Sequence, residues 1–165
     1  MIKKDMAKNK KTEIDTLMLD FRRRCTGNAT LEAMASLVED EFRRVFSVDS
    51  DVKSPDSRRI NKILRASRGL ETGMKTFLTK YNNCPTDLQK QTMGGFMERL
   101  LHPNPGATHR PLPSPVFNEV SKRDGCIRKK RNEYLHQAGV YPSTQATSSY
   151  IESVFRFFAT ILTLA

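Results

Sequence analysis

The chain has 165 residues, about the length of one domain, which excludes a large multidomain machine. With 38% hydrophobic residues it can build a core, and 28 Lys and Arg against 18 Asp and Glu give a formal net charge of +10. This excess favours a polyanionic partner, either nucleic acid or an anionic membrane surface, and argues against a cationic one. We therefore expect one basic domain over 1–165.

Cysteine usage and hydropathy restrict the compartment. Cys25, Cys84 and Cys126 lie more than forty residues apart, so they suggest neither a disulfide framework nor a zinc knuckle, and a reducing cytoplasm fits. The most apolar stretch, 150–165, contains two charges and is shorter than the roughly 20 residues that span a bilayer. We predict a cytoplasmic protein with no membrane partner, no metal and no cofactor.

Helical periodicity dominates the sequence, and no alternating Val, Ile and Thr run with hairpin turns competes with it. The fold class predicted is all-α. Residues 1–12 contain five lysines and are expected to form a flexible basic start. The first helix should follow and end near Gly27, with an apolar face formed by Ile14, Leu17, Met18 and Phe21.

Capping signals place the next helices. A second helix is expected to start at Thr30 as N-cap and to bury Leu31, Met34, Val38 and Val45. Ser54 and Pro55 open a long third helix, whose apolar stripe comprises Ile60, Ile63, Leu64, Leu70, Met74, Phe77 and Leu78. A fourth helix should follow Pro85 and use Leu88, Phe96 and Leu100, with Gly94 and Gly95 weakening its middle.

The other face of the third helix is densely basic, with Glu71 as its only acid after Asp56. It is either a phosphate-contacting surface or an ordinary solvated face. Its cations are Arg58, Arg59, Lys62, Arg65, Arg68, Lys75 and Lys80.

The stretch 102–115 holds five of the eight prolines, so it should be an extended loop. We interpret this Pro-rich loop as a mobile spacer rather than a functional lid.

Ser114 and Pro115 repeat the N-cap and proline signature and predict one helix that continues past Gly125 to His136. Its apolar stripe stays in phase across the glycine and comprises Val116, Phe117, Val120, Ile127, Tyr134 and Leu135. Arg131 lies within that stripe. Because burying an unpaired charge costs several kcal/mol, it needs a carboxylate from another helix, a place at the mouth of a cleft, or a bound phosphate.

His136 follows Arg131 by five residues, about 140° around an ideal helix, whereas Asn132 and His136 share a face. Asn132 could orient the imidazole. Arg131 and His136 cannot meet within one straight helix, so either the helix ends at His136, with Gly139 as its C′ residue, or a second chain completes the site. A purely structural interpretation also holds: a histidine in the last turn complements the helix dipole, and Lys129 and Glu133 form an ordinary pair.

The run Arg131-Asn132-Glu133-Tyr134-Leu135-His136 resembles the RNxxxH (Rx4-6H) signature of HEPN domains, which are small all-α bundles, many of them RNA-cleaving toxins and defence effectors. The resemblance implies an up-and-down bundle of about five to six helices. It also implies a metal-independent endoribonuclease with Arg131, Asn132 and His136 as catalytic residues. His136 would assist attack of the ribose 2′-hydroxyl and Arg131 would stabilise the phosphate charge. One departure is Ala138, where toxins encoded beside a nucleotidyltransferase antitoxin often carry tyrosine.

The family further implies a homodimer with a composite active site, a prokaryotic toxin or antiviral role, and an antitoxin or defence-system partner. The last helix bears two adjacent apolar stripes, so it is either a central core helix or part of a dimer interface. RNA-binding candidates are Arg128, Lys129, Lys130, Arg65 and Arg68. The alternative function is a non-catalytic basic helical module that binds nucleic acid or a protein partner.

Overall fold

A computed structural model describes residues 2–47, 54–83, 88 and 91–165. Within these residues the regular structure is entirely helical and no strand occurs, which confirms the all-α class; six helices have nine residues or more. The elements are α1 (Ile2–Cys25), α2 (Ala29–Arg44), α3 (Pro55–Tyr81), α4 (Met93–Leu101), the single turn α5 (Ser114–Phe117), the π-helical turn η2 (Asn118–Lys122), α6 (Ile127–His136) and α7 (Thr144–Leu162).

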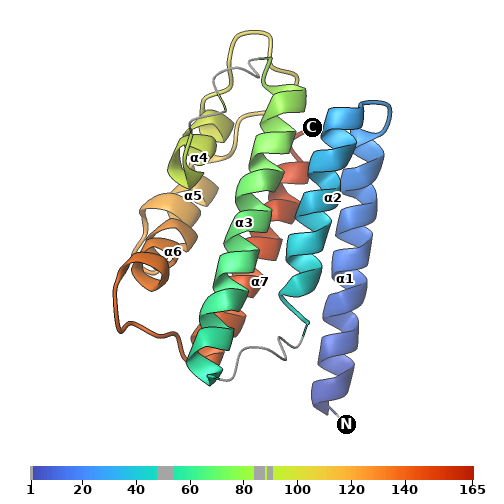
Figure 1. The fold of residues 1–165 in the computed structure, drawn as a ribbon. Helices are drawn as coiled ribbons and strands as arrows, with labels where there is room; N and C mark the ends of the chain where they lie inside the picture. The colour runs from blue at the N-terminus through green and yellow to red at the C-terminus, as the bar shows by residue number, and fades with distance from the viewer. Residues whose placement is uncertain (1, 48–53, 84–87, 89–90) are drawn as a thin grey trace.

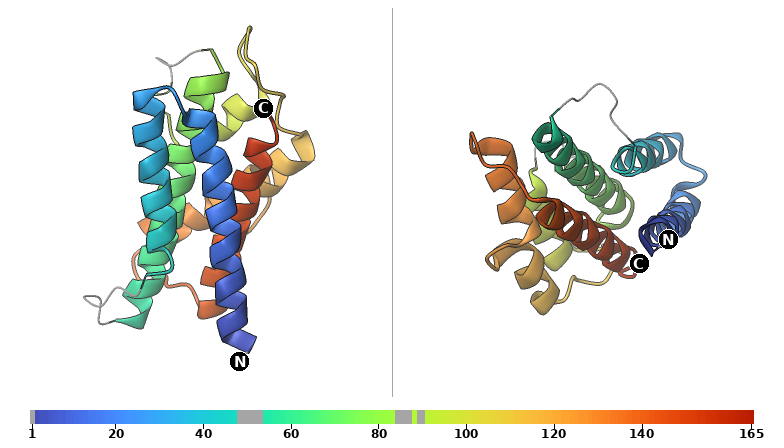
Figure 2. Two further views of the ribbon diagram at one scale, coloured as in Figure 1. Left: turned by 90° about the vertical axis from the view of Figure 1, so that its right-hand side faces the viewer. Right: turned by 90° about the horizontal axis from the view of Figure 1, so that it is seen from below.

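Two long helices, α3 and α7, organise the bundle (Figure 1). The α1–α2 hairpin packs on one side of this pair, and α4, α5 and α6 pack on the other (Figure 2). Large residues from α1, α2, α3 and α7 interlock at the centre, where the Phe158 ring meets Phe21 and Phe42 edge-on. A Cβ on Gly69 would lie 2.3 Å from the Phe42 ring, and one on Gly73 would lie 2.5 Å from Phe158. These two glycines therefore let α3 approach its neighbours closely.

The N-terminal hairpin differs from two expectations. Residues 2–12, expected to be flexible, are the first turns of α1, in keeping with a stretch rich in lysine and other good helix formers. The second helix starts one residue after Asn28 rather than at Thr30, because the Asn28 side chain accepts a hydrogen bond from the Leu31 amide. Of its predicted core residues, Leu31, Val38 and Val45 are buried and Met34 is half-buried.

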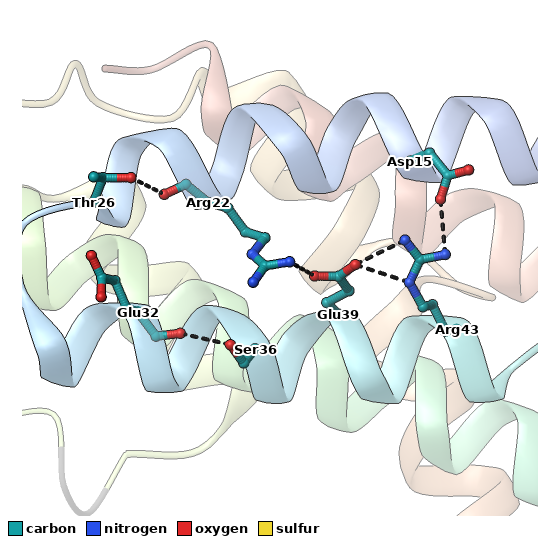
Figure 3. Close-up of polar contacts among 7 residues, drawn as sticks. All are labelled: Asp15, Arg22, Thr26, Glu32, Ser36, Glu39 and Arg43. Carbon is teal, nitrogen blue, oxygen red and sulfur yellow. Dashed lines mark hydrogen bonds and ion pairs between the residues drawn. The ribbon is translucent and has the colours of Figure 1, made fainter.

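Charges connect α1 to α2. Glu39 accepts hydrogen bonds from both Arg22 and Arg43, and Arg43 also pairs with Asp15 at 2.9 Å (Figure 3). Part of the basic excess is thus engaged in bonds within the fold.

The middle of the chain corrects two further predictions. Pro85 lies outside the described residues, and α4 begins at Met93 after the cap Thr92, so Gly94 and Gly95 occupy its first turn instead of its middle. Leu88 is buried but precedes this helix.

The loop between α4 and α5 is not a loose spacer. Its backbone amides at Thr108, Arg110 and Leu112 donate to the carbonyls of Tyr81, Leu164 and Leu100, respectively. The buried His109 ring lies against Asn82, with 3.2 Å between Nε2 and Oδ1. Prolines prevent helix formation here, yet three backbone amides of the loop find partners at or next to the ends of three helices.

The last helix is a central core helix of the monomer. Both of its apolar stripes are buried within one chain, apart from the half-buried Phe155. Packing against α1, α3 and α6 explains the width of its apolar surface.

Candidate active site

The motif residues lie on α6, which is separate from the helix that precedes it. The predicted continuous helix from Ser114 to His136 is wrong: α5 and η2 end at Lys122, and α6 starts at Ile127. Gly125, with a φ of +74°, makes the turn between them, a conformation that residues with a Cβ adopt only at a cost. The apolar stripe predicted one continuous helix because the segments before and after the turn both pack against the same core, so their apolar residues keep a helical spacing across it.

Contacts along α6 and just beyond its end hold this helix in place. Ile127 is buried, and Tyr134 packs partly buried against the core. The Arg128 Nε donates to the Ser121 carbonyl at 3.0 Å, and its Cδ would lie 3.2 Å from a Cβ on Gly94. Beyond the helix, the Arg59 Nε donates to the Pro142 carbonyl at 2.7 Å. The start of α6 and the segment that follows the helix are therefore fixed to the bundle.

Arg131 finds its partner on the longest helix. Its Nη2 lies 3.1 Å from the Oε1 atom of Glu71 on α3, and both side chains are a quarter exposed. This is the first of the three predicted possibilities, a carboxylate from another helix. The buried Nε of Arg131 has no hydrogen-bond partner among the described residues. Sequence reasoning missed Glu71 as a site residue, although its isolation as an acid on a basic helix face was visible.

The opposite edge of the guanidinium meets the other two motif residues. The Arg131 Nη1 donates to the Asn132 Oδ1 at 3.1 Å and lies 3.5 Å from the His136 Nε2. Arg131 and His136 thus converge within one chain, because α6 ends at His136 and the last-turn side chain is free to fold back. Gln137 is the C-cap, so Gly139, with a φ of +79°, lies in the following turn and is not the C′ residue.

The geometry defines roles for the polar atoms. Arg131 can donate to the imidazole only if Nε2 carries the lone pair, which places the ring proton on Nδ1. The predicted bond from Asn132 to His136 is not formed; the Asn132 carboxamide oxygen accepts from Arg131 instead, which leaves its exposed NH₂ group available to a ligand. A guanidinium, an amide donor and an imidazole ring therefore lie together at the surface.

Most of the predicted RNA-binding cations form ion pairs or hydrogen bonds with other residues of the chain. Arg65 pairs with Glu41 at 3.1 Å, and Lys129 pairs with Asp124 at 2.8 Å, which lowers the pKa of Asp124. Lys130 bonds to Glu133, which raises the pKa of Lys130, and its Nζ lies 5.4 Å from the centre of the Tyr134 ring. The predicted pair of Lys129 with Glu133 is therefore wrong: Lys129 pairs with Asp124, and Glu133 pairs with Lys130.

The cluster of Arg131, Asn132 and His136 opens on the surface, while a hollow of about 160 Å³ lies on the α7 side of the same helix, lined by Lys130, Tyr134 and Tyr150 among others. The described residues contain no group of three or more His, Cys, Asp or Glu arranged to hold a metal ion. Nor does any helix in this part of the chain combine the length and hydropathy needed to cross a membrane.

Comparisons with protein-family models, curated proteins and solved structures gave no match to this chain.

Proposed function

We propose that the chain is a metal-independent endoribonuclease in which Arg131, Asn132 and His136 form the reaction centre. The observation that carries this proposal is the convergence of Asn132 and His136 on the guanidinium of Arg131 at the exposed end of α6. These groups are the ones that cleavage by a ribose 2′-hydroxyl requires: a proton acceptor and fixed positive charge at the phosphate.

The reaction follows from the positions of these groups. When Arg131 turns from His136 to the phosphate, it frees the lone pair on His136 Nε2, which accepts the proton of the 2′-hydroxyl as the bond from the 2′-oxygen to phosphorus forms. The bond from phosphorus to the 5′-oxygen breaks, leaving a 2′,3′-cyclic phosphate, and the departing oxygen takes a proton from water. Arg131 and the Asn132 NH₂ group donate hydrogen bonds to the phosphate oxygens as their charge grows.

The resemblance to HEPN domains supports the same chemistry and extends the proposal to a prokaryotic toxin or antiviral effector of the cytoplasm, with an antitoxin or defence-system protein as partner. A homodimer is part of the proposal. Because Arg131 and His136 already meet within one chain, a second copy would contribute a second site.

The test is incubation of purified protein with RNA in EDTA. We expect cleavage to 2′,3′-cyclic phosphate ends, and a His136→Ala variant should lose at least about 100-fold in rate, the contribution typical of general base catalysis. His102→Ala is the matched control, because His102 is an exposed histidine after α4, and it should cleave like the wild type. Unchanged cleavage by His136→Ala, or no cleavage of any RNA by the wild type, contradicts the proposal.

One observation favours a second candidate, a non-catalytic basic module. The bond between Arg131 and Glu71 gives the arginine a structural role that needs no chemistry. This alternative predicts salt-dependent RNA binding without turnover. A well-folded Arg131→Ala protein that has lost cleavage excludes it.

A further inference from the structure

Two cations without a described partner lie beside the Arg131 cluster. Arg68 precedes Glu71 by three residues on α3, and Lys75 follows it by four. With 3.6 residues per turn, these spacings put all three side chains on one face of α3. Since Glu71 contacts Arg131, that face borders the cluster on α6.

The other predicted RNA-binding cations form ion pairs or hydrogen bonds within the fold, whereas Arg68 and Lys75 do not. Neither Arg68 nor Lys75 makes an ion pair or hydrogen bond within the described part of the chain, and Arg68 is exposed while Lys75 is half-buried. Arg131 neutralises the carboxylate that lies between them, Glu71. The net charge of this face is therefore positive.

We propose that Arg68 and Lys75, on either side of the Glu71–Arg131 pair, form a binding track for the phosphates of single-stranded RNA. The inference rests on the proposed function and names how its substrate is held. A cation without a protein partner breaks no ion pair when it binds a phosphate. The whole free energy of releasing counterions from the RNA backbone then contributes to its affinity. A single strand is required because the A-form duplex backbone holds the 2′-oxygen away from the position opposite the 5′-oxygen.

The spacing of the track favours separate phosphates. Lys75 follows Arg68 by seven positions on α3, about 10 Å along the helix axis. Glu71 lies between Arg68 and Lys75 along the axis of α3. Its partner Arg131 is therefore placed between the two cations along the same axis. The strand would then contact one cation on each side of the phosphate that is cleaved.

The experiment measures binding without turnover. Fluorescence anisotropy follows the full chain binding a fluorescein-labelled oligouridylate whose 2′-hydroxyls are methylated, so that no nucleophile is present, over a series of salt concentrations. The variants are Arg68→Ala, Lys75→Ala and the double substitution. The matched control is Lys62→Ala, an exposed lysine of the same helix that lies about 120° from Arg68 around its axis and also has no described partner.

Each track variant should reduce the slope of log affinity against log salt by about 0.7, the value for one phosphate contact on a single strand, and the double variant by about twice that. Lys62→Ala should keep the wild-type slope. Unchanged slopes in the track variants, or an equal loss in Lys62→Ala, overturn the track because the attraction would then be diffuse.

The same proteins separate this inference from the proposed function. Cleavage of unmethylated RNA with unchanged slopes overturns the track alone. Reduced slopes in the track variants, together with a wild-type protein that cleaves no RNA, support the track and contradict the nuclease.

Discussion

At the scale of single residues, Arg131 combines a packing problem with the proposed chemistry. It lies on the buried stripe of α6, where a charge requires a partner, and Glu71 supplies one. The same bond turns the other guanidinium nitrogen toward Asn132 and His136. Glu71 is therefore a positioning residue for the proposed site, acting through Arg131.

Replacing Glu71 by glutamine tests this positioning. We expect the kcat for RNA cleavage to fall about tenfold, equivalent to about 1.4 kcal/mol, with KM little changed, because Arg131 loses its orientation rather than its charge. The unfolding free energy should fall by about 1 kcal/mol or less, since both side chains are a quarter exposed.

Glu41→Gln is the matched control. Glu41 also pairs between helices, with Arg65 at 3.1 Å, but away from the cluster. It should lose a similar amount of stability and keep its kcat. Equal effects of the two substitutions on kcat would show that Glu71 has no positioning role.

Tyr150 gives a pH-dependent prediction. Burial raises the pKa of its phenol, more than its hydrogen bond with Ser67 at 2.7 Å lowers it. The folded protein therefore holds this proton more tightly than the unfolded chain, so the contribution to stability is complete below the unfolded pKa of about 10 and is lost at higher pH. Denaturant unfolding should show a steeper alkaline loss of stability in the wild type than in Tyr150→Phe.

At neutral pH the same variant should lose about 1 kcal/mol with its hydrogen bond, a modest cost because Ser67 keeps its bond to the Ile63 carbonyl. Parallel pH profiles of the two proteins above pH about 10 would contradict the assignment of the alkaline loss to Tyr150.

At the scale of elements, the turn at Gly125 sets the direction of α6 and so the position of Arg131 and His136. A continuous helix and a broken one make opposite predictions for Gly125→Ala. Alanine in a continuous helix would stabilise the protein by about 1 kcal/mol, whereas alanine at a φ of +74° should destabilise it by about 1 to 2 kcal/mol. No atom lies within 4 Å of the added Cβ, so the cost is conformational.

Thermal or denaturant unfolding shows whether Gly125→Ala raises or lowers the free energy of unfolding. Gly27→Ala is the control, because Gly27 also has a positive φ of +88° and no neighbour within 4 Å of a Cβ, in the turn between α1 and α2. Both variants should be destabilised. A stabilised Gly125→Ala protein would support the continuous helix.

Periodicity and capping residues predicted the elements whose signals are local. Ser54 and Pro55 begin α3 as expected, and the apolar face of the first helix is buried except for the partly buried Leu17. The break at Gly125 was missed because the apolar phase continues across it. The start of α4 was missed because Pro85 gave a stronger signal than the Thr92 cap.

The site was predictable only in part, for a similar reason. The motif identified Arg131 and His136, but the helical wheel placed them apart, since it cannot represent side chains that fold back at a helix end. Glu71 was out of reach, because the pairing of two helices separated by sixty residues of sequence is a tertiary property.

At the scale of the whole molecule, the placement of α7 changes the expected role of a second copy. The apolar stripes that suggested a dimer are used in the core of one chain, between α3 and the α1–α2 hairpin (Figure 2). The arginine and histidine of the proposed site also belong to one chain. We therefore expect a homodimer to have two separate sites instead of a composite one.

Mixing two inactive variants distinguishes these arrangements. Arg131→Ala and His136→Ala are unfolded together, refolded as a mixture so that subunits can exchange, and assayed on RNA in EDTA. A composite site would restore activity, because a heterodimer would contain one intact Arg131 and His136 pair across its interface. With both residues in one chain, every subunit lacks half of its own site, so we expect the mixture to remain as inactive as each variant alone. Wild-type protein taken through the same refolding must regain its activity as the control, and recovery of cleavage by the mixed variants would contradict the single-chain site.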